Sequence, residues 1–76
     1  MVQVVAYILM VTDIGKEHEI LNQLSKIKGV TEARTVYGEF DLIARVEAGD
    51  MRTLDSAVTQ IRKIGSVIRT VTLISS

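Results

Sequence analysis

Several residue types on which common functions depend are missing from this chain of 76 residues. It has no cysteine, so neither a disulfide nor a thiolate metal site can stabilise it, and a heavy-metal carrier with paired cysteines is excluded. Aromatic residues make up only 4%, and nine Lys plus Arg balance nine Asp plus Glu. Because RNA-recognition domains need stacking aromatics in basic surroundings, this composition does not fit a nucleic-acid binder.

Long apolar runs and catalytic motifs are absent as well. The longest apolar run, from Val4 to Val11, falls far short of the ~20 residues that a membrane span requires. The amino-terminal residues also lack the pattern of a signal peptide, so we expect a cytoplasmic protein without membrane contact. No Gly-x-x-x-x-Gly-Lys phosphate loop occurs. His18, the one histidine, lies among charged residues with no nucleophile beside it, so we expect no catalytic residue, metal or cofactor.

What the chain does contain is an unusual amount of Val, Ile and Leu. The hydrophobic fraction is 47%. A domain of this length buries only about 60% of the surface that its unfolded chain exposes. The apolar content therefore exceeds what one small core needs, and it predicts an oligomer in which the surplus is buried between copies.

The apolar patterns predict six elements in the order β-α-β-β-α-β. Strands are expected at residues 2–12, 30–37, 40–47 and 67–74, and helices between residues 16 and 28 and between 51 and 64. The first strand is apolar at odd and even positions, which is typical of a strand covered on both faces. Gly29 and Gly65 are expected to end the two helices as left-handed caps, and Asp50 to cap the start of the second.

This order predicts an α+β fold, the ferredoxin-like plait, with a four-stranded antiparallel sheet and both helices on one face. An Arg-Thr-Val triplet at residues 34–36 recurs at residues 69–71 and suggests that the two halves are related. On the third strand, alternate residues from Phe40 to Val46 suit the helix-covered face. The other face mixes apolar and polar residues, so we expect a dimer as the minimal unit, with two copies paired face to face there or paired along their sheet edges.

The connection between the two middle strands is the most informative segment. Gly38-Glu39 fits a two-residue type II′ turn, in which Gly38 takes a positive φ. Asp41 then interrupts an apolar strand, although aspartate is a poor strand former. Two readings stay open for it: the carboxylate caps nearby backbone, or it binds a ligand.

Threonines on the last strand give Asp41 a possible context. Thr70 and Thr72 lie at alternate positions, although threonine also favours strands for its own sake. Together, one carboxylate, two hydroxyls and the turn amides suit a zwitterion. Asp41 would pair with an α-ammonium group, while the turn amides and the threonine hydroxyls would hold an α-carboxylate.

These segments resemble a known family. The run Gly38-Glu39-Phe40-Asp41-Leu42-Ile43 resembles the Gly-x-Tyr-Asp-Leu-hydrophobic segment of the Lrp/AsnC family, in its effector-binding domain, often called RAM (regulation of amino-acid metabolism). Phe40 stands here in place of the family's tyrosine. The closing strand, residues 69–74, is similar to the family's last strand with its paired threonines.

The resemblance implies more than the residues alone. It implies that residues 1–76 form a single RAM-type domain without the helix-turn-helix of full-length members, and hence no direct DNA binding. It also implies sheets paired into a dimeric α/β barrel, four such dimers in an octamer, and co-assembly with full-length Lrp/AsnC-type regulators. The domain would then modulate transcription of amino-acid metabolism indirectly. A free amino acid effector would bind between dimers, at Gly38, Glu39, Phe40, Asp41, Thr70 and Thr72.

Two rival functions remain. The first is an enzyme of the dimeric α/β-barrel type, such as a small monooxygenase or isomerase, for which only Tyr7, Arg45 and Arg69 are candidate residues. The second is an assembly partner that binds no ligand. Stabilisation by an amino acid would favour the regulatory reading over both.

Overall fold

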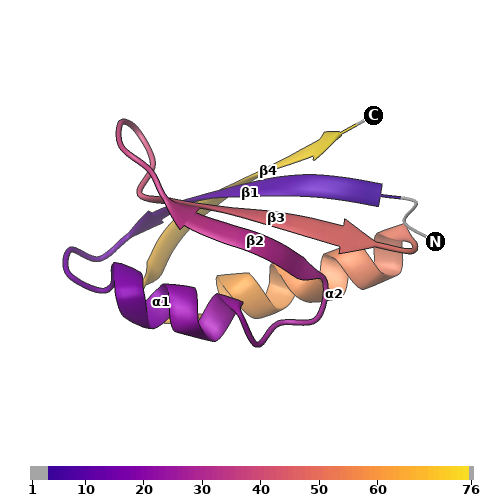
Figure 1. Ribbon diagram of the computed structural model, residues 1–76, viewed down its shortest axis with the longest axis horizontal. Coiled ribbons are helices and arrows are strands. Elements are labelled where there is room, and N and C mark those ends of the chain that lie inside the picture. Colours follow the sequence, from indigo (N-terminus) through magenta and orange to yellow (C-terminus); the bar gives the residue numbers. More distant parts are fainter. Residues whose placement is uncertain (1–3, 76) are drawn as a thin grey trace.

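The computed structural model describes residues 4–75, which form a four-stranded antiparallel sheet with two helices on one face (Figure 1). The elements are β1 (Val4–Thr12), α1 (Glu17–Leu24), β2 (Val30–Thr35), β3 (Leu42–Ala48), α2 (Met51–Arg62) and β4 (Val67–Ser75). The strand order β2-β3-β1-β4 puts β1 and β3 in the centre of the sheet. This is the predicted ferredoxin-like plait. Within residues 4–75, neither helix has the length and apolarity needed to cross a membrane.

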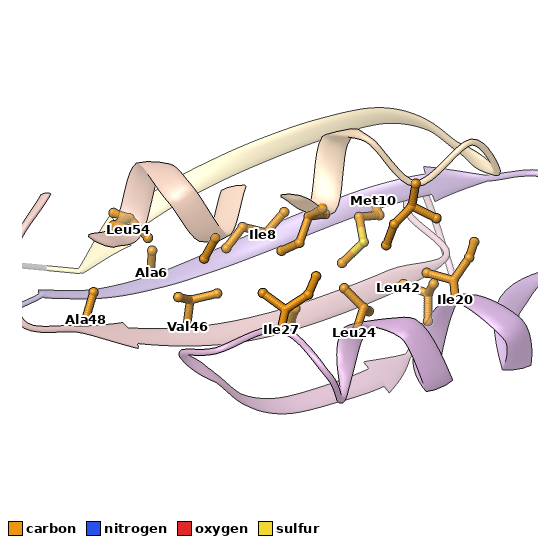
Figure 2. Close-up of a cluster of buried hydrophobic side chains, with 14 residues drawn as sticks. Ala6, Ile8, Met10, Ile20, Leu24, Ile27, Leu42, Val46, Ala48 and Leu54 are labelled. Atoms are coloured by element: carbon orange, nitrogen blue, oxygen red, sulfur yellow. The ribbon is translucent and has the colours of Figure 1, made fainter. Parts of the chain in front are cut away.

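The core lies between the sheet and the helices (Figure 2). Every second residue of the central strands points into it, and so do the apolar stripes of both helices. The buried residues are Ala6, Ile8 and Met10 from β1, Leu42, Ala44, Val46 and Ala48 from β3, Ile20 and Leu24 from α1, and Leu54, Ala57 and Ile61 from α2. Ile27 and Ile64, which follow the two helices, complete the core.

The second helix starts as predicted. The Asp50 side chain accepts a hydrogen bond from the Thr53 backbone N–H at 2.8 Å, so one of the unpaired amides at the start of α2 has a partner. The first helix is shorter than predicted. After Leu24 the chain tightens, because the Ile27 N–H donates to the Leu24 carbonyl three residues back.

The two glycines after the helices have different roles, so the prediction of matching left-handed caps is wrong. Gly29 has φ +99° but lies beyond the end of α1, where its carbonyl accepts the Glu47 N–H at 2.8 Å. A Cβ at Gly29 would lie 3.1 Å from the Glu47 carbonyl oxygen. Gly65 does not take a left-handed φ and has open space around it. Glycine is therefore required at the first position only.

The connection between β2 and β3 differs from the expected tight turn. The predicted strands at residues 30–37 and 40–47 are too long at this end, because β2 stops at Thr35 and β3 starts at Leu42. A Val36 N–H to Asp41 carbonyl bond of 2.9 Å closes a wider loop, residues 36–41. Gly38 has the expected positive φ, +116°, but the two-residue type II′ turn is wrong. The physical reason is that Asp41 is bonded on both sides: its N–H donates to the Met10 carbonyl of β1 at 2.8 Å while its own carbonyl accepts the Val36 N–H, so the residues between Val36 and Asp41 form the turn.

The face of the sheet opposite the helices is uncovered in a single chain (Figure 1). Leu9 of β1 lies opposite Ile43 and Val71 on its two neighbours, and directly opposite residues point to the same face. We call this the open face. Thr70 lies opposite the buried Met10, so it points to the helix-covered face instead. Coverage of β1 on both faces, as predicted, would therefore require a second copy.

Candidate functional site

The six predicted site residues fall into two groups in one chain. Residues 38–41 lie in the loop between β2 and β3, which projects from the end of the sheet on the side away from the helices (Figure 1). Thr70 and Thr72 lie in the edge strand β4, opposite Met10 and Ile8 of β1. The sequence could not show this separation, because it depends on which face each β4 residue occupies.

Asp41 holds the end of β1. Its Oδ2 accepts the Thr12 backbone N–H at 2.9 Å, across a separation of 29 residues. Asp13, the first residue after β1, donates its N–H to the Ser66 carbonyl at 2.9 Å. The Asp41 carboxylate therefore caps backbone, but the capped residue lies on β1 and not in the hairpin itself, where the cap was expected. Of the two oxygens of the Asp41 carboxylate, only Oδ2 accepts a hydrogen bond from residues 4–75, so Oδ1 can still accept one from a ligand.

The tip of the loop is open to solvent. Gly38 and Glu39 are exposed, and Tyr37 beside them is as exposed as in an extended chain, at 102%. A Cβ at Gly38 would meet no atom within 4 Å. The backbone amides at this tip are therefore accessible to a ligand or to another copy of the chain.

The two threonines line a groove between α2 and β4. The groove has a volume of about 480 Å³, within the range of small-molecule sites. Its lining residues are Val58, Arg62, Val67, Ile68, Arg69, Thr70 and Thr72. No aspartate or glutamate is among them, and the hydroxyls of Thr70 and Thr72, which point to this side of the sheet, can both donate and accept hydrogen bonds. We call it the β4 groove.

Arg69 links the two groups of predicted residues. Its guanidinium lies over the Phe40 ring, 5.6 Å from the centroid, in a cation–π contact. On β4 it lies opposite Val11, so its side chain points to the open face, whereas its neighbour Thr70 points to the helix-covered face. The contact with Phe40 carries no local sequence signal, because it joins a loop to a strand on the far side of β1.

The three candidate residues of the rival enzyme, Tyr7, Arg45 and Arg69, do not form one site. Tyr7 and Arg45 are directly opposite on β1 and β3, and both line a small hollow of about 150 Å³. Arg45, however, forms an ion pair with Glu47, and this contact, with Tyr7 second, raises the pKa of the guanidinium. Arg69 is engaged with Phe40 instead. In the part of the chain that the structure describes, no cluster of His, Cys, Asp or Glu could hold a metal.

A ferredoxin-like plait with an open sheet face, an accessible loop and a groove beside its last strand is typical of a small ligand-binding domain. The family model described as the Lrp/AsnC ligand binding domain matches residues 5–76. The chain belongs to this family.

Relatives of known structure support the assignment. The crystal structure of FFRP-DM1 is 44% identical, with a TM-score of 0.91, and the match covers 97% of this chain and 100% of that one. Hypothetical protein PHS023 from Pyrococcus horikoshii is also 44% identical, with a TM-score of 0.90 and coverage of 97% and 90%. AsnC of E. coli, at 23% identity and a TM-score of 0.86, shows the same fold over 95% of this chain and 50% of its own.

A curated relative is a transcriptional regulator. An uncharacterised HTH-type transcriptional regulator of Pyrococcus furiosus is 35% identical over 60 residues. The match covers 78% of this chain and 40% of the regulator, so the chain spans well under half of that protein. The family is therefore a regulatory one.

Proposed function

We propose that this domain binds a free amino acid and modulates transcription indirectly, through the regulators with which it assembles. The match of residues 5–76 to the Lrp/AsnC ligand binding domain carries the proposal. A neighbour in fold gives it a precedent: the transcriptional regulator NMB0573 of Neisseria meningitidis was solved as an L-Met complex. It has a TM-score of 0.84 and 17% identity.

The chemistry of the candidate site suits such a ligand. Oδ1 of Asp41 faces no protein donor among residues 4–75 and would accept the α-ammonium group. The exposed amides at Gly38 and Glu39 and the hydroxyls of Thr70 and Thr72 would donate to the α-carboxylate. Because the loop and the β4 groove are separate in one chain, we expect the ligand to bind where two copies meet, with each copy supplying one group.

The open face supplies the pairing that this arrangement needs. Its apolar residues are Val5, Tyr7, Leu9, Val11, Ile43, Val71 and Leu73, none of which is fully buried in a single chain. Burial of apolar surface stabilises association by about 25 cal/mol per Å² before the cost of assembly. We expect two sheets to pair face to face as a dimeric α/β barrel, and four dimers to form an octamer.

The regulatory effect would require a partner that reads DNA. The domain has no net charge, so it lacks the electrostatic footprint of direct DNA binding. Full-length Lrp/AsnC-type regulators share this fold and are the partners that we expect to co-assemble with it. Ligand binding at a shared interface would then alter the population of mixed assemblies.

Thermal unfolding in the presence of each of the twenty amino acids tests the proposal. A ligand that binds only the native state stabilises it by RT ln(1 + [L]/Kd), about 2.7 kcal/mol at a hundredfold excess over Kd. For a domain of this size, that corresponds to a rise in Tm of roughly 10 °C or more. No rise with any of the twenty, at millimolar concentrations, would refute amino-acid binding.

Matched variants localise the effect. Asp41→Asn keeps an acceptor for Thr12 but removes the charge, and Thr72→Val removes only a hydroxyl, so both should reduce the ligand-induced rise in Tm. Asp55→Asn and Thr59→Val are the controls, because these residues are exposed on α2 and do not line the groove. If neither site variant weakens binding, the proposed site is wrong.

A further inference from the structure

The loop between β2 and β3 has a fixed base and a projecting tip (Figure 1). Its base is held because the Val36 N–H donates to the Asp41 carbonyl at 2.9 Å, while the Asp41 N–H donates to β1. Phe40 is held as well, under the Arg69 guanidinium. We call residues 37–39 the loop tip. A tip on a fixed base is presented in one orientation, which lowers the entropic cost of docking.

The loop tip carries one large aromatic side chain and one charge. Tyr37 is 102% exposed, so no other part of residues 4–75 shields its ring. Glu39 is exposed too, and it forms no ion pair within residues 4–75. Single exposed apolar residues are common on protein surfaces. The tip therefore indicates a docking element only if a matching site exists elsewhere.

The β4 groove matches the loop tip in shape and charge. Val58 of α2 and Val67 of β4 give it apolar walls. Arg62 lies one turn after Val58 on the same side of α2, and it forms no ion pair within residues 4–75. A tyrosine ring can pack on such walls with a guanidinium near its face. The volume of about 480 Å³ is in the range that holds a small molecule, so it admits one tyrosine side chain.

A second groove shows what this match depends on. Between α1 and β2 lies a groove of about 390 Å³, lined by Leu21, Ser25, Val30, Thr31, Glu32 and Ala33. None of these residues is a lysine or an arginine, so this groove offers no cation to the Glu39 carboxylate. We therefore expect the loop tip to select the β4 groove.

The loop tip and the β4 groove of one chain are apart. The tip projects on the side of the sheet away from the helices, whereas the groove lies between α2 and β4, where Thr70 and Thr72 point to the helix-covered face (Figure 1). The full exposure of Tyr37 agrees with this separation. A contact between tip and groove must therefore join two copies of the chain.

We propose that the loop tip of one copy docks in the β4 groove of another, with Tyr37 between the apolar walls and Glu39 paired with Arg62. The proposal rests on the amino-acid function proposed above only for the purpose of the contact, which is to bring the loop of one copy to the threonines of the other. Each copy has both a tip and a groove, so the contact can repeat in a closed assembly.

The two side chains of the tip have different roles in this contact. Tyr37 supplies most of the affinity, because a docked aromatic side chain buries a large apolar area. The pair of Glu39 and Arg62 lies at the solvent-exposed rim, so it fixes the orientation of the tip and adds less to the affinity. Salt should therefore weaken the contact only in part.

Thiol cross-linking tests the contact directly, because the chain has no cysteine of its own. Glu39→Cys and Thr72→Cys are placed in separate chains with different tags, and the mixture is treated with a short bismaleimide. Tyr37 is unchanged in both chains, so a cross-linked pair that carries both tags is expected. The control mixture combines Glu39→Cys with Asp55→Cys, an exposed position of α2 outside the groove, and should give little product. Equal yields from the two mixtures would refute the docking.

Exchange of the two charges tests the orientation of the tip. Glu39→Arg and Arg62→Glu should each raise the Kd between copies roughly tenfold in sedimentation equilibrium, because each brings like charges together. A chain with both substitutions regains an opposite pair and should recover most of the loss. Asp55→Arg, outside the groove, is the matched control and should leave the Kd unchanged. Additive losses in the double variant would show that the two residues do not meet.

The aromatic ring is tested in the same way. Tyr37→Ala should raise the Kd roughly tenfold or more, since it removes the anchor, while Tyr37→Phe keeps the ring and should stay close to the wild type. The side chain is exposed, so both variants should fold, and circular dichroism checks this. A wild-type Kd in Tyr37→Ala would overturn the proposal.

These results are distinguishable from a failure of the proposed function. If tip and groove cross-link but no amino acid raises the Tm, the docking stands and the amino-acid function is wrong. If an amino acid raises the Tm but the cross-link does not exceed its control, the function stands and the docking is wrong.

Discussion

The hydrogen bond from Thr12 to Asp41 offers a direct test of how this end of the sheet is held. Thr12 is 6% exposed and its N–H donates to the Asp41 carboxylate at 2.9 Å. Asp41→Ala removes the acceptor and leaves this amide buried without a partner, which costs about 1–3 kcal/mol. Because Asp41 is only half-buried, we expect a loss near the middle of that range, about 2 kcal/mol.

The comparison with Asp41→Asn decides the cause. Asparagine keeps an oxygen acceptor of the same reach but gives up the charge, so the loss should be about 1 kcal/mol or less. Since 1 kcal/mol changes Tm by about 4–8 °C in a domain of this size, Asp41→Ala should melt roughly 8–16 °C lower and Asp41→Asn less than about half as far. Asp55→Ala, an exposed position on α2, should stay within about 0.5 kcal/mol of the wild type.

Thermal unfolding by circular dichroism, without ligand and at one protein concentration, measures these differences, because assembly makes Tm depend on concentration. Amide hydrogen exchange adds a local readout: the Thr12 amide should lose protection in Asp41→Ala, while amides in the centre of β3 should lose much less. If alanine and asparagine have the same small effect and the Thr12 amide keeps its protection, the carboxylate does not hold β1.

Three further predictions concern the helices, the glycines and the open face. Asp50→Ala should lower Tm at neutral pH. In the wild type, hydrogen bonds from Thr53 lower the pKa of the Asp50 carboxyl below 3.8, so the carboxylate stabilises the fold above pH 3.8. This stabilisation disappears as the pH falls through the native-state pKa. A titration of Tm against pH checks this, and identical profiles for variant and wild type would contradict it. Gly29→Ala should lower the free energy of unfolding by about 1–2 kcal/mol, because Gly29 has a left-handed backbone. Gly65→Ala should change it by no more than about 0.5 kcal/mol. Equal losses for the two variants in urea unfolding would show that the backbone argument is wrong. Leu9→Glu places a charge on the open face, so light scattering should report a smaller assembly, and an unchanged mass would exclude pairing through this face.

The sequence predicted most of the fold because its main signals are local. The continuous apolar run of β1 marks a strand, while alternation along β3 and helical spacing along α2 place apolar residues on one side of each element; burial of those sides leaves few arrangements. The Asp50 cap was equally readable, since its partner Thr53 is three residues away. Gly65 was misread because a glycine after a helix is a frequent cap but not a required one.

The site was only partly predictable. Gly38 takes the expected positive φ, yet the loop around it is wider than a hairpin turn, because Asp41 bonds to β1 and Phe40 contacts Arg69. Both contacts join segments distant in sequence. The face occupied by Thr70 was likewise undecided, since β4 alternates threonines with residues of mixed polarity and either face was possible.

The sequence alone determined the lack of cysteine, the balance of charge, the excess of aliphatic residues and the order of the elements, since these are properties of composition and of local periodicity. Tertiary structure decided which residues share a surface. It separated the loop at residues 38–41 from the β4 threonines, tied Asp41 to Thr12, and placed the Arg69 guanidinium over the Phe40 ring. The physical reason is that strand register and edge position are settled by packing across the whole sheet, which no single segment encodes.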